Sequence, residues 1–465
     1  MINLNSAQFY KSYVGVYLAD YIKEKRMQDG RLNLILFIFF LTMLIVSLGI
    51  SKPIFAKTDT GGVKVTNTGP EIYIKKNFEE NIKNKYAGSY VTFPTEGMAH
   101  IKKVKYINSK PIRINIVELN TNVNPNLKIK PKIASNTLNH KTTVRRIAQK
   151  ENSILAVNGG FFKPQTGVPL GALMIDGKVL TGPIYNRVGI AIFDEDDKTS
   201  YKMLNINFDI SAITPDFILK IDNINQPRML STHTLMYTSD WGKISPPPPN
   251  GGYNLLIKNN KPVMVSSNPV EITEDSFVIS AQSDKIFQLK KQSKIKINIK
   301  LQDEIQNAKH IIGAGPYLVK NSQIYVDYKT QKLQDEVQGA KHIIGAGPFL
   351  VKNSQVYVDF KAQKLQAISG KNPRSAIGFK KDGTFVIVTV DGREQNSVGM
   401  TLYELANLMK NIGCEYAMNF DGGSSSAMYI KGKIVNNAVN KEGIAVSNAL
   451  IVNEVNPDNI QISSL

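Results

Sequence analysis

Four short segments of the sequence place acidic, amide or guanidinium side chains next to glycines. The segments are AVNGGFF (156–162), NPRSAIGF (372–379), TVDGREQNSVG (389–399) and MNFDGGSSSAM (418–428). In three of them an apolar, strand-like run ends at Asn158, Asp391 or Asp421, and a glycine follows at once. Glycine lets a backbone approach a ligand closely, and polar groups at strand ends commonly line a cleft. The pattern therefore predicts one site that contains two carboxylates.

Two carboxylates and an asparagine that converge could also hold a divalent cation. Ca²⁺ and Mg²⁺ prefer hard oxygen ligands, and Asp391 and Asp421 would supply them. No segment has the spacing of an EF-hand loop. The residues therefore leave a Ca²⁺ or Mg²⁺ site open and identify no certain cofactor.

A serine-rich turn in the fourth segment raises the alternative of an acyl hydrolase. GSSSA (423–427) approaches the G-x-S-x-G nucleophile elbow, but an alanine stands at the second glycine position. That mechanism also needs a histidine base after the serine in the usual chain order. The last histidine is His342, which lies upstream, so we do not expect acyl transfer.

The elements that must position these residues are mostly strands. Alternating patterns predict strands over 112–120 and 127–135, and an apolar run at 154–162 predicts a buried strand that enters a glycine turn. Helices are expected over 142–151, capped by Thr142 or Thr143, and over 400–413. The second helix has Thr401 as its cap, Glu404 at the capping-box position and Gly413 as its stop.

The N-terminal region predicts a membrane segment. Residues 32–50 form a run of nineteen residues without a charge, long enough for one helix to cross a bilayer. Basic residues are concentrated before this run, so the cytoplasmic leader is 1–31 and the rest of the chain is exported. A cleavable signal peptide with Ala56 at the cleavage position is the alternative. We expect a membrane-anchored protein with an extracytoplasmic catalytic domain, or a secreted one if the signal is cleaved.

The remaining chain divides into a linker and one domain. Residues 51–105 are rich in Lys, Asn, Gly and Thr, which is typical of a tether, and the domain is expected over 106–465. Residues 200–300 are interpreted as an elaboration of that domain, with a proline-rich loop at 241–252. Trp241 beside this loop could stack on a sugar or close over a core edge. The expected fold class is α+β, a strand-dominated mixed sheet domain with few helices, preceded by one N-terminal transmembrane helix.

A tandem duplication interrupts the domain. Residues 301–332 and 333–364 are identical at 26 of 32 aligned positions. Either copy can make the same strand pairs, so the two compete for one place in the sheet. The second copy leads directly into 372–379 and is expected to fill that place. GAGP in each copy lacks the spacing of a phosphate-binding loop and is interpreted as an ordinary turn.

Composition indicates a globular protein and restricts its partners. Hydrophobic residues make up 42% of the chain, charged residues make up 20%, and the formal charge is +19. The excess cations are mostly lysines spread along the chain, without an arginine-rich stripe interleaved with aromatics, so nucleic acid is not an expected partner. Cys414 is the one cysteine; it excludes internal disulfides and is interpreted as a buried thiol.

Taken together, the motifs resemble the phosphodiester glycosidase family over roughly 110–455. The markers are NGGFF, PRSAIGFKKDG, VDGR, the GMTLYELANLM helix and NFDGGSSSAM. The family often has a third glycine where this chain has Ser424. The duplication is a larger departure, because the family pattern has one copy before PRSAIG.

The resemblance implies hydrolysis of a sugar 1-phosphodiester, of the GlcNAc-1-phosphate type, in a phosphorylated glycan or exopolysaccharide. Cleavage through an oxocarbenium-like state needs a carboxylate near the anomeric carbon and donors on the phosphate. The implied catalytic residues are Asp421, Asp391, Arg374 and Asn158. The implied substrate-binding residues are Gly159, Gly160, Arg393, Gly422, Gly423, Ser424 and Ser425. The alternative is a non-catalytic glycan-binding or polysaccharide-assembly protein, because a duplicated segment beside the site could disrupt it.

Overall fold

A computed structural model describes the greater part of the predicted domain. The described residues are 70–184, 187–195, 198–314, 317–324, 351–352, 355–356 and 370–455. The chain divides into two compact units, Met1–Asn67 and Thr68–Leu465, and all described residues belong to the second. The predicted leader, the predicted transmembrane helix at 32–50 and the linker before residue 70 lie outside them. No helix of the described part is long and apolar enough to span a membrane.

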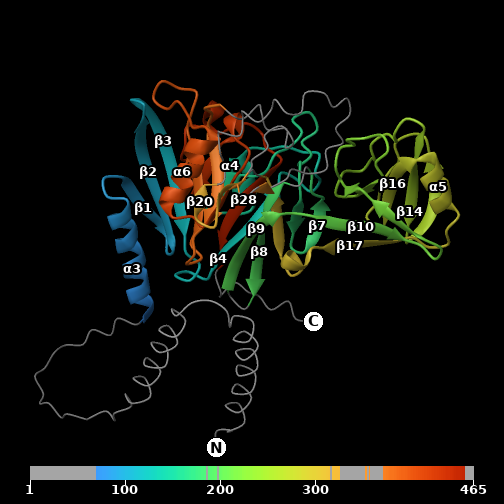
Figure 1. Ribbon diagram of the computed structural model, residues 1–465, viewed down its shortest axis with the longest axis horizontal. Coiled ribbons are helices and arrows are strands. Elements are labelled where there is room, and N and C mark those ends of the chain that lie inside the picture. Colours follow the sequence, from blue (N-terminus) through green and yellow to red (C-terminus); the bar gives the residue numbers. More distant parts are fainter. Residues whose placement is uncertain are drawn as a thin grey trace, which may run out of the picture. The chain divides into compact units, whose positions relative to one another are not determined.

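The largest sheet of the described part has eight antiparallel strands, of which β1, β2 and β3 are labelled at the left of Figure 1. In sheet order its strands are β1 (Tyr90–Thr95), β2 (Met98–Ile107), β3 (Lys110–Leu119), β24 (Phe385–Val390), β23 (Arg374–Phe379), β25 (Tyr416–Asn419), β19 (Tyr317–Lys320) and β20 (Gln323–Ile324). Helices α3 (Pro70–Lys85) and α6 (Leu402–Ile412) pack against it, and Ile82 and Met409 are buried in the shared core. This sheet carries three of the four chemistry-bearing segments.

Two five-stranded sheets share the same core. One has the order β27 (Lys433–Ile434), β26 (Met428–Ile430), β5 (Leu155–Asn158), β28 (Asn448–Glu454) and β4 (Leu127–Ile133). The other has the order β7 (Lys178–Thr181), β6 (Leu173–Ile175), β18 (His310–Gly313), β8 (Val188–Glu195) and β9 (Lys198–Asn205). Val117, Val157 and Ile190, one from each sheet, are all fully buried in this core. Helix α4 (Val144–Lys150) packs on Ala156 of β5 and has Thr143 as its N-cap, as predicted.

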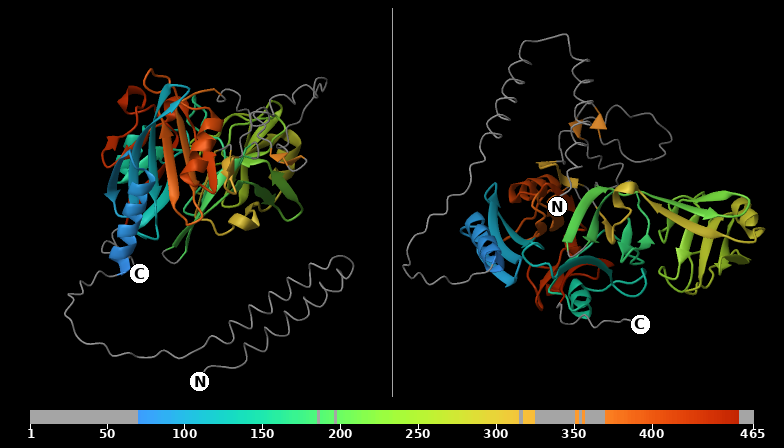
Figure 2. Two further views of the ribbon diagram at one scale, coloured as in Figure 1. Left: turned by 60° about the vertical axis from the view of Figure 1, so that its left-hand side comes forward. Right: turned by 90° about the horizontal axis from the view of Figure 1, so that it is seen from below.

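Residues 208–301 form a lobe with its own core. Its strands are β10 (Phe208–Ile213), β11 (Ile218–Ile221), β12 (Asn223–Ile224), β13 (Leu235–Thr238), β14 (Gly252–Lys258), β15 (Lys261–Ser266), β16 (Ser276–Gln282) and β17 (Lys296–Leu301), and its helix is α5 (Ser283–Lys290). Figure 2 shows these elements gathered in green and yellow. Residues 239–251 contain no strand or helix. Trp241 makes an edge contact with Tyr237, with 5.0 Å between ring centroids, so the tryptophan closes a core edge.

The expected tether does not hold from residue 70 onward, because α3, β1 and β2 occupy most of 70–105. The lysine-rich composition of this stretch led to the prediction of a linker, although it contains a short apolar segment. Met98, Ala99 and Ile101 of that segment are fully buried at the start of β2. A fragment that begins near residue 105 would lack α3, β1 and most of β2. The strand-dominated α+β class predicted for the domain is confirmed in the described part, which has four α-helices and one parallel strand pair, β12 with β13, whereas the N-terminal transmembrane helix stays a prediction.

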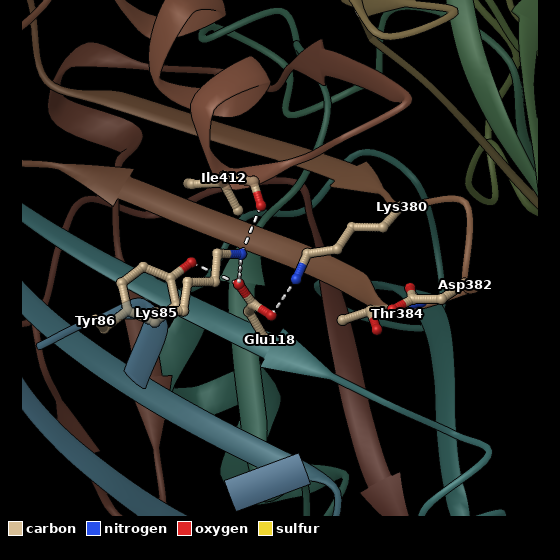
Figure 3. Close-up of polar contacts among 7 residues, drawn as sticks. All are labelled: Lys85, Tyr86, Glu118, Lys380, Asp382, Thr384 and Ile412. Carbon is tan, nitrogen blue, oxygen red and sulfur yellow. Dashed lines mark hydrogen bonds and ion pairs between the residues drawn. The ribbon is translucent and has the colours of Figure 1, made fainter. Parts of the chain in front are cut away.

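A buried glutamate and Lys85 connect α3 to the sheet and to the end of α6 (Figure 3). The side chain of Glu118 on β3 is 1% exposed. Its Oε1 accepts hydrogen bonds from Lys85 Nζ at 2.7 Å and from the Tyr86 hydroxyl at 2.5 Å, and its Oε2 pairs with Lys380. Lys85 Nζ also donates to the carbonyl oxygen of Ile412, the last residue of α6, at 2.5 Å. Glu118 and Lys85 together therefore link α3 and the end of α6 to β3 and to the residue that follows β23 (Arg374–Phe379).

The first repeat copy fills the place in the sheets, and the expectation for the second copy is wrong. Residues His310–Gly313 form β18 between β6 and β8, and Tyr317–Lys320 form β19 between β25 and β20. The described residues of the second copy, β21 (Val351–Lys352) and β22 (Gln355–Val356), pair with each other. Because the copies have the same residues at nearly every paired position, sequence could not separate them.

Deleting either copy is expected to leave a folded chain. All four β18 residues recur at 342–345. Among the changes whose burial the structure describes, the one at a fully buried position is Ile305 to Val337. Loss of one methylene from a core costs about 0.5–1.5 kcal/mol. The chain without 301–332 should therefore be about 1 kcal/mol less stable than the chain without 333–364, as measured by urea unfolding. Failure of either deletion to fold would show that the copies are not interchangeable.

Candidate active site

The ends of three adjacent strands bring the predicted acidic residues together. Strand β23 is antiparallel to both β24 and β25. The end of β24, the start of β23 and the end of β25 therefore lie at the same end of the sheet, with Asp391, Arg374 and Asp421 there. Strand β5 ends at Asn158 in the second sheet, and Asn158 Nδ2 donates to the carbonyl oxygen of Asp421 at 2.6 Å. All four predicted segments meet at this point.

Helix α6 connects the Asp391 loop to β25, and its predicted ends are confirmed. Thr401 Oγ1 accepts from the Glu404 amide, and Glu404 accepts from the Thr401 amide, which makes a complete capping box. Gly413 ends the helix with a φ of 98°, a left-handed conformation that glycine adopts without a steric penalty. The buried face of the helix packs on β25, the strand that leads to Asp421, and on the neighbouring strands β19 and β20.

Asn158 lies inside the scaffold rather than in an open cleft. The residue is fully buried. Its Oδ1 accepts from Ser375 Oγ at 2.7 Å and from the Ala427 amide at 3.3 Å, while its Nδ2 is bonded to Asp421. With its amide bonded at both ends to protein, Asn158 positions the Asp421 segment against β23.

The glycines after Asn158 are required by close packing. A Cβ on Gly159 would lie 1.9 Å from Asn448 Oδ1, and a Cβ on Gly160 would lie 2.6 Å from the carbonyl oxygen of Gly313. The Gly160 amide donates to Asn448 Oδ1 at 2.9 Å. Gly313 belongs to the GAGP sequence of the first repeat copy, so that copy forms part of the wall behind NGG. Asn448 was not expected from the sequence.

Asp421 combines partial exposure with an unusual ionisation. Its Oδ1 accepts from the Gly422 amide at 3.0 Å. Burial raises the pKa of Asp421 to about 6, although hydrogen bonds from Ser425 and Gly422 and the positive charge of Arg187 act in the opposite direction. The sequence motifs gave no indication of Arg187, whose guanidinium carbon lies 4.9 Å from the ring centre of Phe161. This carboxyl can exchange a proton near neutral pH.

Asp391 is buried and held by the loop that precedes β28. Its Oδ1 accepts from the Asn437 amide at 2.9 Å, and its own carbonyl oxygen accepts from Ser397 Oγ at 2.6 Å. Burial raises the pKa of Asp391, while Asn437, Asn436 and the charge of Arg113 oppose that effect. The motifs gave no indication of Arg113 or Asn437, because both lie outside the glycine-containing segments.

Arg374 is an internal residue. It is 1% exposed, and its Nε and Nη2 donate to the carbonyl oxygens of Met400 at 2.8 Å and Gly370 at 2.5 Å. These bonds fix the start of β23 against the residues that lead into α6. Arg374 therefore holds the start of β23 in place from within the fold, and the catalytic role that the resemblance implies for it stays a prediction.

Arg393 is the exposed arginine of the site. Its Nη2 donates to Asn372 Oδ1 at 2.8 Å, and its Nη1 donates to Ser424 Oγ at 3.4 Å. Its φ of 64° is in the left-handed region, which a non-glycine residue adopts at some cost and which is often found at functional positions. A Cβ on Gly423 would lie 3.1 Å from Arg393 Nη2. Arg393, Asn372 and Ser424 thus form a donor-rich group for an anion beside Asp421.

The acidic residues form a poor cage for a divalent cation. The described residues include no group of three or more His, Cys, Asp or Glu side chains that could hold a metal. The Oδ1 atoms of Asp391 and Asp421 already accept backbone N–H donors, and the charge of Arg187 acts on Asp421. Ca²⁺ requires six to eight oxygen ligands, so a cation here would need most of them from elsewhere.

The C-terminal part of the chain matches a known protein family. Residues 327–453 match the family model described as phosphodiester glycosidase. The resemblance to the phosphodiester glycosidase family is confirmed. The matched segment contains Arg374, Asp391 and Asp421 of the phosphodiester glycosidase motifs and begins after Asn158. It starts within the first repeat copy and includes the whole of the second.

Relatives and solved structures extend the comparison. A stretch of 67 residues is 49% identical to the SPbeta prophage-derived uncharacterized protein YomE of Bacillus subtilis (strain 168), covering 14% of this chain and 10% of YomE. A hypothetical protein from Synechocystis has a TM-score of 0.64 at 20% identity, over 78% of this chain and 63% of that chain. A putative exported protein from Burkholderia pseudomallei has a TM-score of 0.58 at 20% identity, over 74% of each chain. These two structures show the same fold.

Proposed function

We propose that this chain hydrolyses a sugar 1-phosphodiester, of the GlcNAc-1-phosphate type, in an extracytoplasmic glycan or exopolysaccharide. One observation carries the proposal: a carboxyl that titrates near neutral pH, Asp421, lies beside an exposed, donor-rich group built from Arg393, Asn372 and Ser424. A carboxylate next to an anion-binding group is what this bond requires. The family match supports the same reaction class.

In the proposed mechanism the phosphate needs charge stabilisation more than a proton. The phosphodiester leaves as a phosphomonoester, which is a weak base, so Arg393 and Ser424 bind its oxygens as the C1–O bond breaks. Asp421 in its ionised form stabilises the oxocarbenium-like carbon, as the nucleophile or as the base for water. Asp391 is the second carboxylate of the site, and Arg374 and Asn158 hold the two acidic segments in position. The products are the free sugar and a phosphomonoester.

The proposed setting is outside the cytoplasm. The uncharged run at 32–50 would anchor the chain to the membrane, or cleavage after Ala56 would release it. Either arrangement presents the site to cell-surface or secreted glycans. Protease accessibility of the domain in intact cells, with lysed cells as the control, would measure its side of the membrane.

A non-catalytic glycan-binding protein is the second candidate. Its support is the duplication, because Gly313 of the first copy lies directly behind Gly160, and a second copy could compete for that place. Release of free sugar from GlcNAc-1-phosphodiesters by the full-length chain separates the two functions. Binding without release would favour the second candidate. Dialysis against EDTA, followed by addition of Ca²⁺ or Mg²⁺, measures any metal requirement in the same assay.

The pH profile of hydrolysis should rise through an apparent pKa near 6. Asp421 acts as the anion in the proposal, so kcat/KM increases as pH rises past the raised pKa of this group. Ser425 donates a hydrogen bond that favours the charged form, and Ser425→Ala should therefore move the rising limb to higher pH. Ser424→Ala is the control, because Ser424 contacts Arg393 rather than the carboxylate. A limb that falls with pH would contradict the assigned role.

A further inference from the structure

The part of the β2–β3 ribbon between Ala99 and Val117 carries positive charge without an acidic residue. From Ala99 to Val117 the chain has four lysines, one arginine and no aspartate or glutamate. The last pair of β24 with β3 is Val390 with Ile114, whereas β2 and β3 stay paired as far as Ile107 with Lys110. The basic ribbon therefore extends past the end of the sheet at which Asp391 lies.

Alternation along β2 divides the ribbon into two faces. Successive side chains of a strand point to opposite faces, so Lys102, Val104 and Tyr106 share one face. Lys103 and Lys105 share the other. Each face has lysine, but only the first has an aromatic ring from β2.

Cross-strand pairing adds two residues to the first face. Tyr90 of β1 is opposite Lys102, and Arg113 of β3 is opposite Val104. Tyr90, Val104 and Tyr106 are 65%, 52% and 68% exposed, and Arg113 is also exposed. We call Tyr90, Lys102, Val104, Tyr106 and Arg113 the aromatic–basic face.

The aromatic–basic face is continuous with the candidate active site. The Asp391 amide donates to the carbonyl oxygen of Arg113 at 3.0 Å, and the Arg113 amide donates to Ser397 Oγ at 3.0 Å. Side chains of Arg113 and Asp391 lie on the same side of the sheet by register, and the charge of Arg113 acts on the Asp391 carboxyl. A chain bound at the site would therefore have this face next to it.

We propose that the aromatic–basic face binds the anionic glycan chain that extends from the scissile phosphodiester. The inference rests on the proposed function and names its substrate class, a polymer of sugar phosphates. Such a polymer carries one negative charge for each phosphodiester and has apolar faces on its sugar rings. Tyr90 and Tyr106 offer rings for the sugar faces, and Lys102 and Arg113 offer donors for the phosphates. The positive charges and the aromatic rings of this face therefore both match a polymer of sugar phosphates.

The test compares two changes on opposite faces of the same strand. The face variant is Lys102→Glu with Tyr106→Ala, and the matched control is Lys103→Glu, which makes the same charge change on the other face. Both are made in the full-length chain. The probes are a soluble polymer of N-acetylglucosamine 1-phosphate repeats and a single GlcNAc-1-phosphodiester of methanol. Binding is also measured with Asp421→Asn present, so that the polymer remains intact.

The face variant should weaken polymer binding about tenfold, with the loss reduced at high salt because salt screens exposed charges. The control should change binding less than twofold. In the active chain, the ratio of kcat/KM on polymer to kcat/KM on the single unit should fall by the same factor for the face variant alone. Equal effects of the face variant and the control would overturn the inference. Absence of turnover from both probes, with the binding difference intact, would instead refute the proposed function.

Discussion

Asp421→Asn is expected to abolish hydrolysis and to make the folded protein more stable. The loss of activity should be on the order of 10³-fold or more, the usual scale for removing a reacting group. Asparagine keeps the size of the side chain and can still accept from the Gly422 amide, but it cannot act as nucleophile or base. Retention of activity by this variant would remove Asp421 from the proposed mechanism.

The gain in stability follows from the raised pKa of Asp421. Its pKa is about 6 in the folded state against the ordinary aspartate value of 3.8. Below about pH 4 the Asp421 carboxyl is neutral, and its burial does not lower the free energy of unfolding. As pH rises through 6 the free energy of unfolding falls, because burial disfavours the ionised form. Above pH 7 the cost is roughly 1–3 kcal/mol, which the neutral asparagine avoids.

Urea unfolding at pH 7.5 and pH 4 measures the size and the sign of this change in stability. The free energy of unfolding of the variant should exceed that of the wild type at pH 7.5, and the difference should disappear at pH 4. Asp209→Asn is the matched control, since Asp209 is exposed on β10, and exposed substitutions usually change stability by less than about 0.5 kcal/mol. An equal gain from both variants would show that the effect is not due to burial.

Glu118→Gln is expected to cost about 3–5 kcal/mol of stability. In the described part of the chain, Glu118 forms ion pairs with both Lys85 and Lys380. Although burial opposes the charged form of Lys380, Glu118 raises the pKa of Lys380 above its ordinary value. A neutral amide would leave two ammonium groups close together without a counter-charge, and breaking a buried pair in this way costs that amount.

Glu442→Gln provides the comparison for the buried pair. Glu442 pairs with Arg145 at 2.7 Å, and both side chains are more than a third exposed. Exposed pairs contribute about 0–1 kcal/mol. The loss in free energy of unfolding should therefore be severalfold larger for Glu118→Gln than for Glu442→Gln. Similar losses would mean that the Glu118 cluster is solvated and contributes little.

Sequence patterns predicted those parts of the fold whose local signals agree with their environment. The Thr401 cap, the Gly413 stop and the apolar spacing between them define α6 in both sequence and structure. By contrast, α3 is largely polar, and its attachment depends on Ile82, Tyr86 and a distant glutamate. Contacts between residues far apart in the chain leave no local signal.

The candidate site shows the same division. Residue type correctly marked the segments that converge, because glycine and acidic residues at strand ends are uncommon away from turns and sites. It did not show which polar groups face solvent. Arg374 and Asn158 bond internal groups, whereas Arg393 is exposed. Which arginine meets a ligand depends on strand register, and register is set by the whole sheet.

The attachment of α3 has a mechanical consequence. A pull applied through the chain before residue 70 would reach the domain at this helix, ahead of any strand. Part of the load would be carried by Lys85 and Tyr86 on Glu118, and by Lys85 on the end of α6. Under such a pull α3 would therefore detach while the strands of the sheets stay paired. Detachment of this helix would protect the strands that carry the site from the force.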